Sequence, residues 1–70
     1  MVWGFTFVAE GPEEAMERAA AERRSNADVP PELVDAIACA ARAMPPGKRI
    51  RVYAFSGAAP DGAVLNVSTA

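Results

Sequence analysis

The chain has 70 residues, a formal net charge of −2 and no histidine, and 51% of its residues are hydrophobic. This length is enough for one domain and too short for two, so one folded unit is expected over residues 1–70. The weak acidic charge excludes a strong overall attraction to nucleic acid or to an anionic membrane, and no stretch is long and apolar enough to span a bilayer.

The predicted core is small, because 16 of the hydrophobic residues are alanine. A core of this size supplies about 3–5 kcal/mol, and natural small domains usually add a disulfide, a metal or a second copy of the chain. Cys39 is the only cysteine, so no internal disulfide can form, and a zinc site without histidine would be unusual. Self-association is the support that remains, and we predict a homodimer or a higher oligomer.

The first expected element is a strand over residues 2–8, which is rich in aromatic and β-branched residues that alternate. One face carries Trp3, Phe5 and Phe7 and is expected to point into the core, because those rings bury the most area. The other face carries Val2, Gly4, Thr6 and Val8. The first residues lack the basic start and long apolar run of a signal peptide, so a cytoplasmic location is expected.

Two helices are predicted next. The first runs from about Pro12 to Arg24, with proline at its start, acidic residues in its first turn and basic residues in its last. Its narrow apolar face consists of Ala15, Met16, Ala19 and Ala20. The second opens at residues 30–32 and ends at residues 45–47, Pro-Pro-Gly. Its apolar stripe is the clearest in the chain and consists of Leu33, Ile37, Ala40, Ala41 and Met44.

Two further strands complete the predicted fold. Residues 48–56 alternate, with Ile50, Val52 and Ala54 facing the core, and residues 63–69 form a strand with Leu65 and Val67 inward. Turn residues at 60–62, Pro-Asp-Gly, connect them as a hairpin. The predicted fold class is α+β, in the order β-α-α-β-β, with two helices packed on one face of a three-stranded, mainly antiparallel sheet. Whether the first strand pairs with the second or with the third stays open.

Conventional catalysis is poorly supported by these residues. Histidine, the usual proton carrier near neutral pH, is absent, and Cys39 lies in an alanine-rich helix, where an inert, partly buried thiol is expected. The acidic residues Glu10, Glu13, Glu14 and Glu17 could hold a divalent cation, but a solvated face with acidic side chains placed favourably for the helix dipole explains them better. We therefore predict a non-enzymatic protein with no catalytic residue, cofactor or metal.

The outer face of the second strand is the candidate site. Arg49, Arg51, Tyr53 and Phe55 point to the same side, beside Val64 of the third strand and Val2 and Val8 of the first. An apolar patch bordered by arginine is typical of an interface. Contact with a protein is favoured, either in a homo-oligomer or with another chain. Nucleic acid, which could stack on these aromatic rings, is the less favoured partner because few basic residues are present.

Several segments together resemble those of short proteins encoded by tailed phages of actinobacteria. They are the opening Phe5–Gly11, the loop Pro46–Arg49, and the closing hairpin with Ser56-Gly57, Asp61-Gly62 and Asn66-Val67-Ser68. The resemblance implies an accessory protein that binds or inhibits a host protein. It also leaves open a minor structural or assembly protein of the particle, and a weak nucleic-acid-binding regulator. It carries over no catalytic residue.

Overall fold

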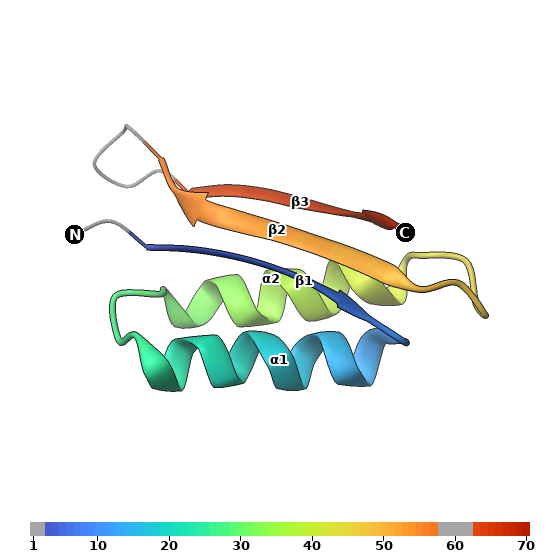
Figure 1. Ribbon diagram of the computed structural model, residues 1–70, viewed down its shortest axis with the longest axis horizontal. Coiled ribbons are helices and arrows are strands. Elements are labelled where there is room, and N and C mark those ends of the chain that lie inside the picture. The colour runs from blue at the N-terminus through green and yellow to red at the C-terminus, as the bar shows by residue number, and fades with distance from the viewer. Residues whose placement is uncertain (1–2, 58–62) are drawn as a thin grey trace.

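The fold is a three-stranded antiparallel sheet with two helices on one face (Figure 1). The computed structural model describes residues 3–57 and 63–70. Its elements, in chain order, are β1 (Gly4–Ala9), α1 (Pro12–Ser25), α2 (Pro31–Arg42), β2 (Ile50–Ser56) and β3 (Ala63–Thr69). The predicted α+β class and the order β-α-α-β-β are therefore confirmed. The turn expected at residues 60–62 lies outside the described residues.

The pairing of the strands answers the question that the sequence leaves open. The strand order is β1-β2-β3, and both neighbouring pairs are antiparallel. The two antiparallel helices return the chain to the sheet beside β1, so β2 pairs with β1. Strand β3 then pairs with the other side of β2. Phe7 lies opposite Val52, which in turn lies opposite Val67. Strand β2 is thus central, and β1 and β3 are the two edges.

Helix α1 begins and ends close to the predicted residues, with Pro12 in its first turn and basic residues in its last. Its buried residues are Ala15 and Ala19, whose small side chains let the helix lie close to the sheet and to α2. Met16, predicted for the same face, is instead 37% exposed. The reason is helical geometry, because each residue turns about 100° from the one before it and Met16 therefore lies beyond the edge of the buried stripe.

Helix α2 buries most of the stripe that its spacing predicts, although Ala40 and Met44 of that stripe are only half-buried. Leu33, Ile37 and Ala41 are buried, and Ile37 is fully so. Val29, in the loop before the helix, is only 2% exposed and joins the same core, although no periodic pattern marks it. After the helix the chain turns at Gly47, whose φ of +80° lies in the left-handed region that favours glycine.

The inner face of the sheet carries the aromatic row that the sequence predicts. Trp3 is buried, and its ring lies 6.1 Å from that of Phe5, which in turn lies 6.0 Å from that of Phe7. Phe5 and Phe7 are half-buried and pack against the core from the β1 side. In the central strand β2, the side chains of Ile50 and Val52 face the helices and are at most 1% exposed.

Candidate interaction surface on the outer face of the sheet

Alternate residues of β2 point away from the helices. Arg51 and Tyr53 are exposed, and Phe55 is half-buried. Arg49 comes one residue before the strand and is also exposed; its carbonyl accepts a hydrogen bond of 2.9 Å from the Ala70 N–H, so the strand pairing extends to it. The structure therefore places these four predicted side chains in one row on the sheet face opposite the helices.

Neighbouring strands widen this row into a surface, which we call the outer face. Its members on the three strands are Gly4, Thr6, Val8, Arg51, Tyr53, Phe55, Val64, Asn66 and Ser68. Val64 lies opposite Phe55 as predicted, and Val2 lies outside the described residues. Sequence reasoning does not single out Gly4, Thr6 and Asn66 as site residues, because only the strand register shows which residues lie beside the β2 row.

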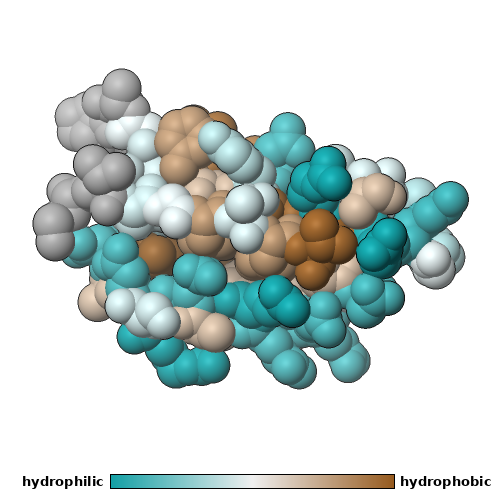
Figure 2. All heavy atoms as spheres, in the orientation of Figure 1, coloured by the Kyte–Doolittle hydropathy of each residue, from teal (hydrophilic) through white to brown (hydrophobic). Residues whose placement is uncertain are grey.

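Apolar side chains are concentrated on the outer face. Among the described residues the exposed large hydrophobic side chains are Val8, Met16, Tyr53 and Val64, with 37%, 37%, 48% and 43% of their surface accessible. Three of these four belong to the outer face. Figure 2 shows apolar side chains gathered over the strands, above the mainly hydrophilic side chains of α1. The sheet therefore leaves uncovered an apolar surface of the kind that binding interfaces use.

A shallow depression lies beside the aromatic side chains of β2. Tyr53 and Phe55 meet edge to face, with ring centroids 5.3 Å apart and an interplanar angle of 83°. Gly4 lies opposite Phe55, and a Cβ atom added at Gly4 would lie 3.2 Å from the Phe55 Cβ. The missing side chain leaves a depression lined by Gly4, Thr6, Tyr53 and Phe55. Its mainly apolar lining suits an apolar side chain from a partner.

The charge of the outer face is positive. None of its members is acidic, and Arg51 lies in its middle row. Within residues 3–57 and 63–70, the ion pair that forms joins Arg18 to Glu14, so the Arg51 guanidinium has no carboxylate partner there. Thr6 adds a polar contact, because its hydroxyl donates a hydrogen bond of 3.0 Å to the Val52 carbonyl. The surface thus offers a cation beside apolar and aromatic groups.

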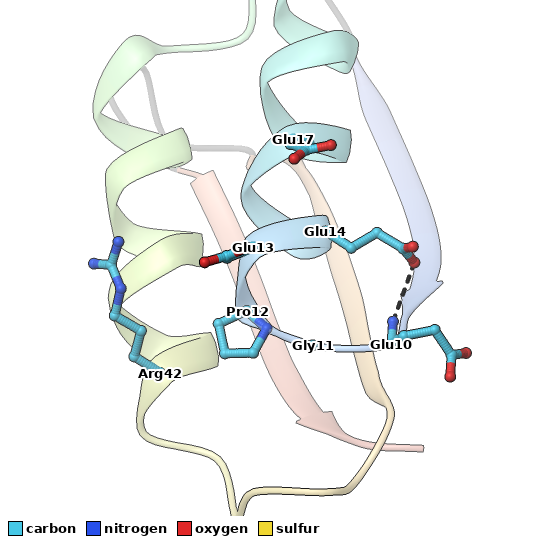
Figure 3. Close-up of a pocket in the computed structure, with 7 residues that line it drawn as sticks. All are labelled: Glu10, Gly11, Pro12, Glu13, Glu14, Glu17 and Arg42. Atoms are coloured by element: carbon cyan, nitrogen blue, oxygen red, sulfur yellow. Dashed lines mark hydrogen bonds between the residues drawn. The ribbon is translucent and has the colours of Figure 1, made fainter.

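The acidic residues form a different site at the start of α1. A surface pocket there is lined by Gly11, Pro12, Arg42 and four acidic residues, Glu10, Glu13, Glu14 and Glu17 (Figure 3). Glu14 accepts a hydrogen bond of 3.1 Å from the Glu10 N–H, whereas Glu13 points to the opposite side, toward α2. In the described part of the chain no three potential metal ligands gather into one group. The Glu14 carboxylate thus contacts the backbone before the helix, and Glu13 and Glu14 lie in the first turn, where the helix dipole favours acidic side chains.

Cys39 differs from its prediction. A partly buried thiol is expected from the sequence, but Cys39 is exposed. The buried stripe of α2 centres on Ile37, and Cys39 lies about 200° further round the helix, so it faces away from the core. It remains without a neighbouring imidazole base, since histidine is absent.

Comparisons with known proteins add no relative. No family model matches the sequence, and neither the curated proteins nor the solved structures gave a significant match. Among the described residues, neither helix combines the length and the apolar character that crossing a membrane requires. The outer face is therefore the feature of the molecule that points to a function.

Proposed function

We propose that the protein is a non-enzymatic interaction module that uses the outer face to bind another protein. The observation that carries this proposal is the joint exposure of Tyr53, Val64 and Val8 around a cation that has no partner among the described residues. Interfaces are enriched in aromatic residues and arginine, and a few such side chains supply most of the binding energy.

The outer face also defines the chemistry of the partner surface. A carboxylate of the partner would lie over Arg51, and an apolar side chain would enter the depression beside Gly4 and Phe55. Complementary charges across an interface add specificity and speed association. We therefore expect the bound surface to be apolar with at least one acidic side chain in the contact.

The resemblance to proteins of tailed phages suggests the biological setting. In that setting the protein would act in the host cytoplasm as an accessory factor that binds or inhibits a host protein. A minor structural or assembly protein of the particle would use the same surface on another phage protein. A nucleic acid is less favoured as the partner, because the net charge is −2 and binding to phosphates requires many cations.

A pull-down from host lysate tests the proposal when it includes a matched control. The outer-face variant carries Arg51→Glu and Tyr53→Ala. The control variant carries Arg24→Glu and Met16→Ala, which make the same kinds of change at exposed positions of α1. Circular dichroism first establishes that both variants are folded. Wild type and control should capture the same protein in stoichiometric amount, and the outer-face variant should lose it.

Calorimetry with the captured protein then gives the size of the effect. The outer-face variant should bind at least about thirtyfold more weakly, as expected when a central interface residue is truncated. Equal binding by the outer-face variant would overturn the proposal, and so would loss of binding in the α1 control. If nuclease treatment abolishes the capture, the bound species is instead a nucleic acid.

A further inference from the structure

The two edges of the sheet are protected to different degrees. Just before β1, the Trp3 carbonyl accepts a hydrogen bond of 2.9 Å from the Ser56 N–H of β2. The odd-numbered residues of β1 therefore bond to β2, and the even-numbered residues direct their backbone N–H and C=O groups to the free edge. The last amide of that outward row, at Glu10, already donates to Glu14. Arg18 pairs with Glu14 and lies over Phe7, 5.9 Å from the ring centroid. Charged side chains of this kind discourage strand pairing at an edge.

The edge of strand β3 is bare of such side chains in the described part of the chain. The Ala70 N–H donates to the Arg49 carbonyl, so residues 64, 66 and 68 bond to β2, and residues 63, 65, 67 and 69 direct their amides and carbonyls outward. Within the described residues no hydrogen bond reaches this outward row. The seven residues of β3 include no charged residue and no proline. An edge of this length and composition is a template for pairing with another strand.

We infer that a second copy of the chain occupies this edge, with β3 pairing antiparallel to the partner's β3 about a twofold axis at Asn66. Only this register overlaps the two strands along their full length. It places Leu65 opposite the partner's Val67 and Ala63 opposite the partner's Thr69, and it forms about eight backbone hydrogen bonds. Leu65 and Val67 are half-buried on the helix side of the sheet. Pairing would cover each of them with an apolar side chain of the partner.

On the helix side of the sheet, small side chains lie beside this edge. Helix α2 packs against the β3 side of the sheet, and α1 packs against β1. On one flank of the buried stripe of α2, Ala38 is only 4% exposed, so that flank faces α1. The other flank, toward the β3 edge, carries Ala36, Ala40 and Ala43, which are exposed or half-buried. Small side chains let the two α2 helices approach to about 8 Å, while the paired strands lie about 4.8 Å apart.

The dimer would double the three-stranded sheet and join the two outer faces into one continuous surface. This inference goes beyond the proposed function, because the edge of β3 and the side chains of the outer face are separate features. It also gives a structural basis for self-association, the support that a small core without a disulfide requires.

A charge exchange at Asn66 tests the register. Asn66 is exposed and would lie directly opposite the partner's Asn66, with Cα atoms about 4.5 Å apart. Asn66→Lys and Asn66→Asp each place like charges across the axis, so each variant alone should dissociate up to about fivefold more readily than wild type in sedimentation equilibrium. An equimolar mixture of the two should recover the dimer. Val8→Lys places a charge on the opposite edge strand and should leave the dimer intact.

A disulfide gives a second and independent measurement. With Cys39 replaced by serine, Asn66→Cys should form a covalent dimer on mild oxidation, because the expected Cα separation lies in the range of about 4.4–6.8 Å that disulfides occupy. Ser68→Cys, in the same Cys39→Ser background, is the matched control. In this register Ser68 lies opposite the partner's Val64, so the two introduced thiols are too far apart to join and should stay reduced.

Three results would overturn the inference. They are a monomeric wild type, a dimer that neither charge at Asn66 weakens, and cross-linking of Ser68→Cys as readily as Asn66→Cys. These measurements need no host protein, so their failure would leave the proposed function standing.

Discussion

The two faces of strand β2 differ sharply, although their residues alternate along one segment of chain. Ile50, Val52 and Ala54 point toward the helices and are at most 1% exposed, whereas Tyr53, between two of them, is 48% exposed. Both helices lie on the inner side (Figure 1), and no described residue covers the outer side. The difference therefore comes from the placement of the helices.

This contrast separates stability from binding within one strand. Six of the twelve buried hydrophobic residues that the structure describes are alanine, so the few large inner side chains contribute a large share of the apolar burial. Exposed outer side chains such as Arg51 and Val64 gain less from folding, because they remain in contact with water. They are free to change with little effect on stability, which is the freedom that a binding surface requires.

The largest effect on stability is expected from Ile50→Ala. Ile50 is 1% exposed, and truncation of a buried isoleucine costs about 2–5 kcal/mol. That loss is comparable with the whole stability of about 3–5 kcal/mol expected for a core of this size. Urea denaturation followed by the fluorescence of Trp3 should show a variant that is largely unfolded.

The neighbouring residue provides the control for this prediction. Arg51→Ala removes a side chain of the same strand from the exposed face, and its free energy of unfolding should stay within about 0.5 kcal/mol of wild type. Similar losses in Ile50→Ala and Arg51→Ala would contradict the division of the strand into a stabilising face and a free one.

Much of this architecture could be predicted from the sequence because its signals are local. Alternation indicates which side of each strand faces the core, and Pro12 and residues 45–47 mark helix ends that the structure confirms within a few residues. Periodicity is less reliable at the margins of a helix face, where Met16 is exposed. It also gives no signal for Val29, since a loop residue becomes buried through tertiary packing alone.

The candidate surface could be predicted only in part. The row of Arg51, Tyr53 and Phe55 follows from the period of two along one strand. The residues beside it, Gly4 and Asn66 among them, depend on pairing between segments about fifty and about thirteen residues apart, which no local pattern determines. For the same reason, the sequence does not show that charged side chains lie at the edge of β1 and that no described charged side chain lies at the edge of β3.

A moderate effect is expected from the aromatic pair, and it would refine the contrast between the two faces. Tyr53 and Phe55 meet edge to face at 5.3 Å, and such pairs contribute about 0.5–1.5 kcal/mol beyond their buried area. A double-mutant cycle with Tyr53→Leu and Phe55→Leu should give a coupling energy in the lower half of that range, because Tyr53 is about half exposed. Thermal unfolding of the four proteins measures this coupling, and a value near zero would show that the pair contributes nothing to folding.

The smallest effect is expected at the rim of the inner face, where Arg18 covers Phe7. Glu14→Gln removes the charge that pairs with Arg18 at 3.7 Å but keeps an oxygen that can accept the Glu10 N–H. Both side chains of the pair are about half exposed, so the loss should be about 0.3 kcal/mol at low salt and should vanish in concentrated salt. Arg18→Gln should cost more and retain a difference at high salt, because it also removes the contact with the Phe7 ring. Equal and fully salt-dependent losses in the two variants would mean that Arg18 protects this edge through its charge alone.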